Sequence, residues 1–389
     1  MKQIGASPRL LAVYPGGESR AIPAWRRSTK EFSVKSAMTF AVAAVASVAL
    51  IAGCTTALET RTKQSLNTLS TPPTTPPQGE RPALSTTKPS KPLKIAIIAI
   101  ENNPFFAQVK TGYDAVKPKI EAAGGTVDWI NAGTDVTVDS VGGAINAAVV
   151  DDYDAIAALM PGDGICTYIR QANAKGVLVA AYNGNASCAQ SSGAVFFHGQ
   201  DLRAAGMQAG QLMCTATKDL ASASKPGVVG VETESFTFQA LEERRLGFLD
   251  GLKQDCPWVT QSGRGVEYQW STDRVASATR DYMTSTKNLV GIYVTGGNPQ
   301  VAAQSVASAG KTSTVKVIGF DFTAENVAQI KAGNMYAAIG QDPYGQSYDT
   351  IVWLYNALVD KQKPSPDYFL PTAAVVGTQA NITTVSAAK

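Results

Sequence analysis

The stretch "LKIAIIAIENNPFF", residues 93–106, joins an apolar run to a short polar and aromatic segment. Its first eight residues are almost all apolar, which predicts a short buried strand. In open α/β sheets, ligands bind beyond the carboxyl ends of the strands. Residues 101–106 are therefore candidates for ligand contact. The structural alternative is that Asn-Pro marks a turn and that the paired phenylalanines fill a core.

The pattern of a strand followed by a helix repeats along the chain. Residues 105–124 carry apolar side chains at helical spacing and end at two glycines, a typical helix stop. Residues 125–133, 153–160 and 177–184 are further β-rich runs, and after "AVFFHGQD", residues 194–201, the alternation restarts. Strands that alternate with helices form parallel sheets covered on both faces. The sequence therefore predicts an α/β fold with two doubly wound parallel-sheet lobes.

Composition excludes several function classes. The 389 residues are 44% hydrophobic and 17% charged, with a net charge of +3, which suits a soluble globular protein of about two domains. This charge is too small for a nucleic-acid-binding surface. His198 is the only histidine and no Cys-x-x-Cys pair occurs, so we expect neither a metal site nor a cofactor.

The N-terminal region predicts export. Residues 38–52 form an apolar run that follows Lys35, is too short to span a bilayer, and ends in "GC". The ending "LIAGC" resembles a bacterial lipobox, which implies a lipid on Cys54 after cleavage at Gly53. The alternative is a buried helix that ends in Gly-Cys by chance. Residues 1–33 are too long and too acidic for the start of a signal peptide, so we expect translation to begin at Val34.

Four cysteines remain after Cys54, namely Cys166, Cys188, Cys214 and Cys256. In an oxidising compartment an even number of cysteines indicates disulfides, and four allow three pairings. We expect Cys166–Cys188 and Cys214–Cys256, because each pair falls within one strand-helix neighbourhood. Free buried thiols are the alternative.

Residues 55–92 are rich in Thr, Ser and Pro and contain almost no large apolar side chains. Such a segment cannot bury a core of its own, so it is expected to be a disordered tether. The folded body is then expected to begin near Leu93.

Six short motifs occur in a recognisable order. They are "NNPFF", "YNGN", "GQD", "RRLGF", "VIGFD" and "IGQDP". Their order and spacing resemble the type I periplasmic sugar-binding proteins, the ribose-binding family, across residues 93 to about 370. The resemblance implies a lipoprotein component of an ABC sugar importer, with no enzymatic activity.

The resemblance also implies where a sugar would bind. Amides and carboxylates satisfy sugar hydroxyls, and aromatic rings cover the apolar C–H faces. The implied ligand residues are Asn103, Phe105, Phe106, Asn183, Glu242, Trp270, Asn298, Asp321 and Gln341.

Three positions depart from the ribose pattern. Met160 replaces an asparagine, Gly184 replaces one arginine, and Glu242 stands where a second arginine binds the ligand. We therefore expect a cleft without a guanidinium group and a neutral, hydroxyl-rich ligand, either a sugar or a sugar alcohol.

The expected domain organisation follows from these patterns. Residues 1–53 are the N-terminal extension and signal peptide, and residues 54–92 are the tether. Residues 93–200 plus 342–368 form the first lobe, and residues 201–341 plus 369–389 form the second. Hinge strands are expected to cross near Gln200–Asp201, near Gln341–Asp342, and after Phe369. The protein is expected to be a monomer. Its expected partners are a small neutral ligand, permease subunits and the outer face of the cell membrane, to which the lipid anchors it.

Three other functions are conceivable for this fold, namely an enzyme, a transcriptional regulator and a receptor module. A hydrolase would need Gly-x-Ser-x-Gly and a dinucleotide enzyme would need Gly-x-Gly-x-x-Gly after the first strand, and neither motif occurs there. His198 could act as a base for Cys188, but we expect a structural histidine. A transcriptional regulator of this fold would need a helix-turn-helix and no export signal. A receptor module that passes its signal to a membrane protein stays open.

Overall fold

The structure is a computed structural model that describes residues 81–100, 103–364 and 368–387. These residues belong to one compact unit that runs from Ser70 to Lys389. The predicted signal peptide, Cys54 and the first part of the predicted tether lie outside the described residues. Among the helices of the described part, none is long and apolar enough to cross a membrane.

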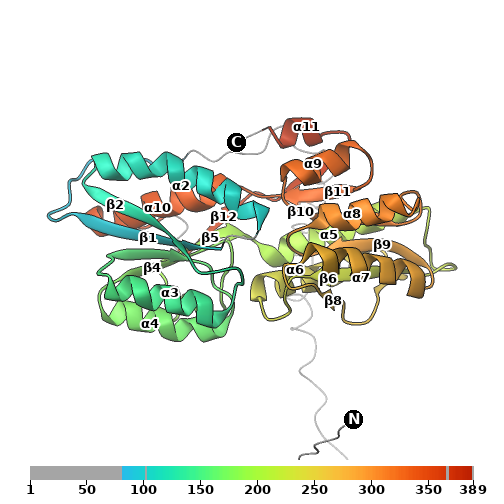
Figure 1. Cartoon of the computed structure of the whole chain (residues 1–389), viewed down its shortest axis with the longest axis horizontal. Coiled ribbons are helices and arrows are strands. Elements are labelled where there is room, and N and C mark those ends of the chain that lie inside the picture. Colours follow the sequence, from blue (N-terminus) through green and yellow to red (C-terminus); the bar gives the residue numbers. More distant parts are fainter. Residues whose placement is uncertain (1–80, 101–102, 365–367, 388–389) are drawn as a thin grey trace, which may run out of the picture. The chain divides into compact units, whose positions relative to one another are not determined.

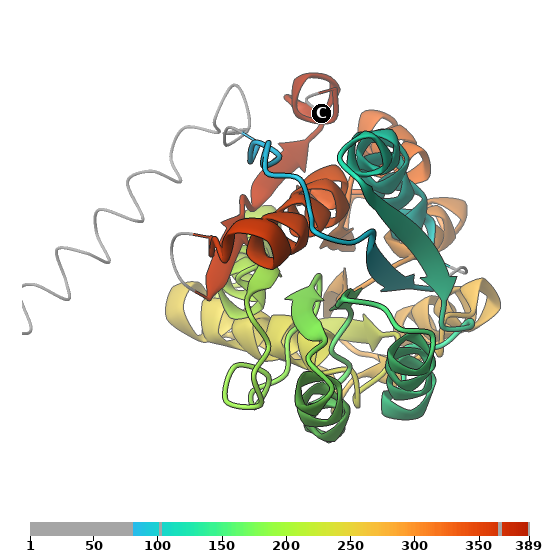
Figure 2. The ribbon, with the colours of Figure 1, turned by 90° about the vertical axis from the view of Figure 1, so that its left-hand side faces the viewer.

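The first lobe is a parallel sheet of six strands in the order β12-β5-β4-β3-β1-β2. Its strands are β1 (Leu93–Ala99), β2 (Gly125–Asn131), β3 (Ala155–Ala158), β4 (Leu178–Tyr182), β5 (Phe197–Gln200) and β12 (Phe369–Thr372). Its helices are α2 (Pro104–Ala122), α3 (Val138–Val150), α4 (Cys166–Ala174) and α10 (Pro343–Asp360), with a 3₁₀ turn η1 (Asp163–Ile165) before α4. Figure 2 views this lobe with α2 and α10 on one side of the strands and α3 and α4 on the other.

The second lobe contains a sheet in the order β13-β11-β10-β9-β6-β7, with β8 paired to β6. Its strands are β6 (Gly227–Thr233), β7 (Val259–Gln261), β8 (Val266–Glu267), β9 (Leu289–Val294), β10 (Lys316–Phe320), β11 (Ala337–Gly340) and β13 (Val375–Thr378). Its helices are α5 (Leu202–Thr217), α6 (Gln239–Asp255), α7 (Thr272–Ser285), α8 (Pro299–Ser308), α9 (Ala324–Lys331) and α11 (Ile382–Val385). Only β13 runs antiparallel, against β11, among the pairings of this sheet in the described residues. Figure 1 shows both lobes with their helices. The predicted fold class is confirmed.

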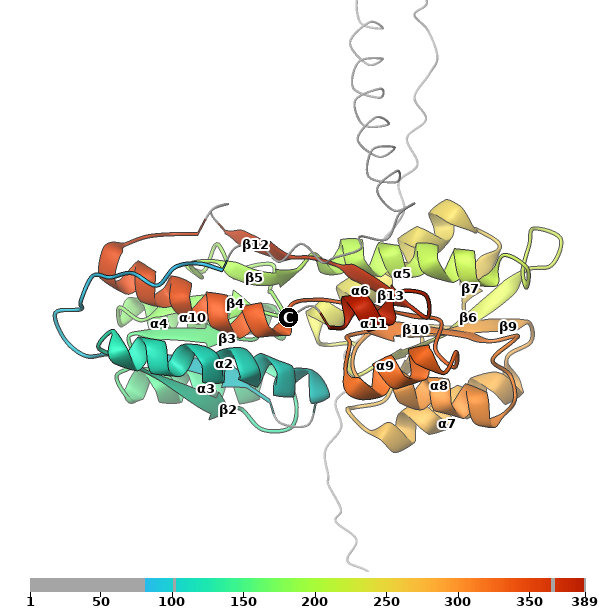
Figure 3. The ribbon, with the colours of Figure 1, turned by 90° about the horizontal axis from the view of Figure 1, so that it is seen from above.

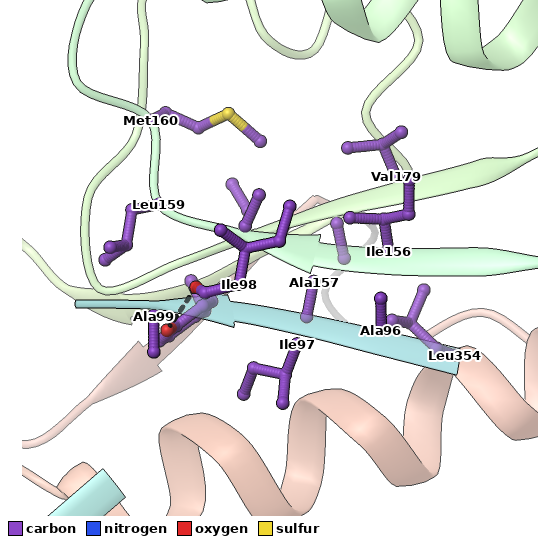
Figure 4. Close-up of a cluster of buried hydrophobic side chains, with 14 of the residues drawn as sticks. Ala96, Ile97, Ile98, Ala99, Ile156, Ala157, Leu159, Met160, Val179 and Leu354 are labelled. Atoms are coloured by element: carbon purple, nitrogen blue, oxygen red, sulfur yellow. Dashed lines mark hydrogen bonds between the residues drawn. The ribbon is translucent and has the colours of Figure 1, made fainter. Parts of the chain in front are cut away.

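The first strand, β1, lies between β3 and β2 in the first sheet, and both of its faces are covered. Ile97 and Ile98 are fully buried. In Figure 4, Ile97 points toward the helix that carries Leu354, and Ile98 lies on the opposite side, which also holds Met160. The continuous apolar run is therefore needed for packing on both faces of a central parallel strand.

The lobes are joined by three chain crossings. The chain leaves the first sheet between β5 and α5, returns between β11 and α10, and leaves again between β12 and β13. The first two crossings lie at Gln200–Asp201 and Gln341–Asp342, as expected. The third lies between β12 and β13, after Phe369 as expected. Phe369–Thr372 nevertheless pairs in parallel with β5, so these residues belong to the first sheet and not to the second lobe.

Residues 81–92 form a strap along α10, which corrects the expectation of a disordered tether up to Pro92. The Arg81 guanidinium pairs with Asp342 at 2.5 Å and with Asp349 at 2.9 Å. The backbone of Ser85 donates to Asn356 Oδ1 at 2.8 Å. Figure 3 shows this segment, in blue, beside α10. A polar segment that cannot form its own core is thus held by the side chains of a neighbouring helix.

Both predicted disulfide bonds are present. Cys166 and Cys188 join the start of α4 to the loop after β4, with 6.1 Å between their Cα atoms. Cys214 on α5 joins Cys256 at the end of α6, with a Cα separation of 5.6 Å. Each bond lies within one lobe, so neither restrains the hinge.

Candidate functional site

A cavity lies between the two lobes at the carboxyl ends of their strands. The first lobe contributes residues that follow β1, β2 and β4, and the second contributes residues that follow β6, β8, β9, β10 and β11. Its lining is Ile100, Asn103, Phe105, Phe106, Val136, Asn183, Glu234, Phe238, Leu241, Arg244, Trp270, Gly296, Gly297, Asp321 and Gln341. Seven of the nine residues proposed from the sequence are among them.

The quoted stretch after β1 supplies one wall. Asn103 caps α2, because its Oδ1 accepts a hydrogen bond from the backbone N–H of Phe105 at 3.0 Å. This cap places both phenylalanines in the first helical turn. Their rings meet edge to face with centroids 5.3 Å apart. Phe105 and Phe106 are therefore buried in the core, as the structural alternative expects, and they also line the cavity, where ligand contact stays a prediction.

Three residues in the lining have left-handed backbone conformations. Asn183, Trp270 and Asp321 have φ angles of 61°, 59° and 70°. Asn and Asp tolerate this region, whereas a bulky residue such as Trp is strained there. Such strain concentrates at binding sites, where it fixes the direction of a side chain.

The rotation of α6 decides which of its charged residues reaches the cavity. Helices α5 and α6 pack with their backbones almost in contact, since a Cβ added at Gly247 would lie 2.1 Å from the backbone oxygen of Arg203. This packing turns Leu241 and Arg244 toward the cavity. Glu242 does not line the cavity, because it lies on another side of α6 and pairs with Arg245 at 2.6 Å. The expectation that the cleft lacks a guanidinium group is therefore wrong.

Arg244 is held firmly by the second lobe and the first crossing. Its guanidinium donates to the backbone oxygen of Thr295 and to Gln200 Oε1, both at 3.1 Å, and lies 3.7 Å above the ring of Phe320. Its Nε is buried and has no partner among the described residues. Burial lowers the pKa of Arg244, and the nearby Asp321 carboxylate opposes this change. Arg244 can therefore donate a hydrogen bond to a ligand without moving.

Glu234 connects the lobes across the cavity. Its Oε1 accepts from Asn103 Nδ2 at 3.2 Å and from the backbone N–H of Gly297 at 3.1 Å. A Cβ at position 297 would lie 2.7 Å from that oxygen, so any other residue there would force Glu234 to shift. Burial raises the pKa of Glu234 to about 7, and the Gly297 N–H opposes the rise.

Two further hydrogen bonds link the lobes nearby. Gln108 Nε2 donates to the backbone oxygen of Phe322 at 3.1 Å, and the backbone N–H of Gln239 donates to Pro161 at 2.9 Å. The cavity itself has a volume of about 30 Å³, which is room for about two water molecules. The structure is therefore a closed conformation, and any larger ligand has to enter while the lobes are apart.

Asp321 and Gln341 form the floor on the second-lobe side. Gln341 Nε2 donates to Asp321 Oδ1 at 2.8 Å. Burial raises the pKa of Asp321, while the charge of Arg244 and the hydrogen bond from Gln341 oppose the rise. A carboxylate and an amide at this edge can accept and donate hydrogen bonds to hydroxyl groups.

The remaining sequence candidates lie outside the lining. Asn298 precedes α8, and its Oδ1 accepts from Gln300 at 3.3 Å, while the preceding glycines line the cavity instead. Met160 is fully buried in the first-lobe core. Gly184 packs against Phe238, whose ring would lie 2.9 Å from an added Cβ.

The one histidine has a structural role. His198 is buried, its Nδ1 is 3.2 Å from Thr350 Oγ1, and burial lowers its pKa to about 4. Cys188, its possible nucleophile partner, is in a disulfide. No group of three or more metal-ligating side chains occurs in the described parts of the chain.

Sequence reasoning missed Glu234, Phe238, Leu241 and Arg244 as lining residues. All four belong to "ESFTFQALEER", residues 234–244, between β6 and the first turns of α6. The signal that could have found them is position, because this segment follows the carboxyl end of β6 as residues 101–106 follow β1.

Comparisons with known proteins agree with this architecture. The family described as "Periplasmic binding protein domain" matches residues 95–363. No curated protein matches the sequence significantly.

Three solved structures are similar over most of the chain. The glucose-galactose binding protein GanP from Geobacillus stearothermophilus is 18% identical, with a TM-score of 0.63, and the match covers 75% of this chain and 99% of GanP. A carbohydrate transporter from Acidothermus cellulolyticus 11B, in complex with myo-inositol, is 23% identical, with a TM-score of 0.64 and coverage of 76% and 97%. A XylFII–LytSN complex contains a chain that is 20% identical, with a TM-score of 0.64 and coverage of 75% and 100%. At such identities the likeness concerns the fold.

Proposed function

Because the chain belongs to the periplasmic binding protein family, we propose that it captures a neutral monosaccharide or sugar alcohol between its two lobes. The observation that carries this proposal is the cavity, where aromatic rings and hydrogen-bonding side chains from both lobes face one another. Ligand binding would begin on one open lobe, and closure about the three crossings would then bury the ligand. The family and its solved neighbours are solute-binding proteins rather than enzymes.

The charges of the cavity favour a neutral ligand, although for a different reason than the sequence suggested. Arg244 supplies one positive charge, and Glu234 and Asp321 lie in the same lining. An anionic ligand would be buried beside two carboxyl groups, which is costly without further cations. Hydroxyl groups can donate to the carboxylates and accept from Arg244 and Asn103. Phe105, Phe106, Phe238 and Trp270 would cover the carbon skeleton.

The proposal extends to the cellular setting. The protein is a monomeric lipoprotein outside the cytoplasm, anchored through Cys54, and it delivers its ligand to the permease subunits of an ABC transporter. The lipobox-like "LIAGC" and the family membership support this proposal. A tether raises the local concentration of the receptor near a membrane partner without any new contact.

A second candidate is a sensing module for a membrane signalling protein. The structural similarity to a XylFII chain solved together with LytSN favours this alternative. Genes for a permease and an ATPase beside the gene of this protein would support uptake, and a sensor gene alone would support signalling.

A thermal-shift screen of the purified protein tests the ligand class. The panel contains D-glucose, D-galactose, D-fucose, D-arabinose, myo-inositol, several amino acids and sugar phosphates. We expect stabilisation by at least one neutral sugar or polyol, since a ligand at 100 times its dissociation constant adds about 2.7 kcal/mol. Stabilisation by an amino acid or a sugar phosphate alone would contradict the proposal.

A further inference from the structure

Behind the cavity wall lies a buried glutamine that touches two of the lining amides. Gln346 on α10 has no exposed surface. Its Nε2 donates to Gln341 Oε1 at 2.7 Å, and its Oε1 accepts from Asn183 Nδ2 at 3.2 Å. With the bond from Gln341 to Asp321, three hydrogen bonds form an amide chain in the order Asn183, Gln346, Gln341, Asp321. This chain runs from the first lobe through the second crossing into the second lobe.

The direction of every bond in the amide chain follows from its last member. An ionised carboxylate only accepts hydrogen bonds, so Gln341 has to turn its NH₂ group toward Asp321. The oxygen of Gln341 then faces Gln346, which has to donate to it. The oxygen of Gln346 faces Asn183 in turn, and Asn183 has to donate. Burial raises the pKa of Asp321, and the charge of Arg244 and the hydrogen bond from Gln341 oppose that rise in favour of the ionised state.

These bond directions have a consequence at Asn183, the end of the amide chain that lies at the cavity. Because Asn183 uses its NH₂ group toward Gln346, its carbonyl oxygen is left on the side of the cavity. That Oδ1 atom has no partner among the residues that the structure describes, and Asn183 lines the cavity. A reversed chain would instead point the NH₂ group at the ligand.

We propose that Gln346 is a positioning residue that fixes the orientation of the Asn183 amide. Because Asp321 only accepts hydrogen bonds, the chain of bonds through Gln341 and Gln346 makes Asn183 present a hydrogen-bond acceptor to the ligand. This inference rests on the proposed function and narrows its ligand class. The ligand needs a free hydroxyl group that donates to Asn183. An analogue with fluorine or a methoxy group at that position can only accept, so the site rejects it.

A neutron crystal structure of the ligand-free protein, exchanged into D₂O, tests the polarity directly. Deuterons distinguish NH₂ from oxygen in side-chain amides, which ordinary X-ray data do not. We expect the nitrogen of Asn183 to face Gln346 and the nitrogen of Gln346 to face Gln341. An Asn183 oxygen that faces Gln346 would overturn the inference. This readout needs no ligand, so it is decisive even if the proposed function fails.

Calorimetric titration of two isosteric variants tests the effect on binding. The probe is the neutral sugar or polyol that gives the largest thermal shift in the panel. Gln346→Glu can accept from Asn183 but, when ionised, cannot donate to Gln341. Binding is compared at pH 9.5, because a buried glutamic acid that stays protonated could still donate to Gln341. At that pH we expect at least tenfold weaker binding than in the wild type. Wild-type affinity in a folded Gln346→Glu protein would overturn the inference.

The matched control is Asn356→Asp, the same amide-to-acid change on the same helix. Asn356 is also buried, but its amide contacts the strap, through the backbones of Ala83 and Ser85. We expect its affinity for the probe to stay within twofold of the wild type. Equal losses of affinity in both variants would mean that a buried acid on α10 is merely disruptive, and would overturn the positioning role.

The preference of the protein for the probe over a fluorinated analogue distinguishes a positioning role of Gln346 from a merely structural role, which would not change that preference. Fluorine at positions that face Glu234 or Asp321 should weaken binding in every variant, because it cannot donate. At the position that faces Asn183, the wild type should prefer the unmodified probe at least tenfold over the fluorinated analogue. In Gln346→Met, which keeps the bulk of the side chain, the amide of Asn183 is free to turn, so this preference should shrink to about threefold or less. An unchanged preference would contradict the proposal. If Gln346→Glu does not fold, Gln346→Met serves as the test variant in its place.

Discussion

Replacing the buried Glu232 with glutamine should remove a large part of the pH dependence of stability. Glu232 on β6 is fully buried, its Oε1 accepts from Thr279 at 2.8 Å, and its Oε2 has no partner among the described residues. Burial raises its pKa from 4.5 to about 8. The folded state therefore binds a proton more tightly than the unfolded state. Stability is fully present below pH 4.5 and is lost as the pH rises through 8.

The size of this effect follows from the difference between the two pKa values. At about 1.4 kcal/mol for each pH unit, the change from 4.5 to about 8 corresponds to a loss of about 5 kcal/mol. In Glu232→Gln the carbonyl oxygen still accepts from Thr279, and no charge forms. At pH 4.5 the two proteins should be similarly stable, because each buries an unpaired donor group, an O–H in the wild type and an NH₂ in the variant. At pH 8.5 the variant should be more stable by several kcal/mol.

Urea denaturation between pH 4.5 and 9, with the disulfides intact, measures the effect. Between pH 5 and 8 the wild type should lose about 1.4 kcal/mol more per pH unit than the variant. The remaining slope of the variant includes Glu234, whose pKa lies near 7. Glu325→Gln, at an exposed position, is the control and should follow the wild type. Parallel curves for the wild type and Glu232→Gln would refute the reasoning.

Three other perturbations follow from the structure. Arg81→Ala should lower the free energy of unfolding by about 2 kcal/mol in urea denaturation, because it leaves the partly buried Asp349 without its cation; an unchanged midpoint would mean that the strap does not stabilise the fold. Replacing both Cys214 and Cys256 with serine should cost about 4 kcal/mol, since that bond closes a loop with a sequence separation of 42; a loss below 1 kcal/mol would contradict this. Cys54→Ala should release the protein from the membrane fraction, and full retention in immunoblots of cell fractions would contradict lipid anchoring.

The fold was predictable from local patterns because its strands are buried on both faces. Continuous apolar runs such as residues 93–100 are typical of central parallel strands, and the helical runs between them are regular. The strap was not predictable, because its composition is that of a disordered tether. Its order depends on Arg81 meeting two acidic side chains more than 250 residues away along the chain.

The cavity was predictable where its residues follow strand ends. Asn183 and Asp321 come directly after a strand, and Asn103 lies in the short segment between β1 and α2, so their positions follow from topology. Residues on α6 were not predictable in the same way. The rotation of α6 about its axis determines whether Glu242 or Arg244 faces the cavity, and packing against α5 fixes that rotation. Gln346 carries no signal in its sequence context, since its role depends on amides from three separate segments.

Binding by residues of both lobes is the central claim, and one calorimetric comparison tests it most directly. The strongest neutral ligand of the panel is titrated into the wild type, Asn103→Ala from the first lobe, Asp321→Ala from the second, and Gln304→Ala, an exposed control on α8. The account predicts that each cavity variant binds about ten to a hundred times more weakly, because a lost partner in a buried site costs about 1 to 3 kcal/mol. The control should bind like the wild type. Wild-type affinity in either cavity variant would mean that the ligand does not bind between the lobes.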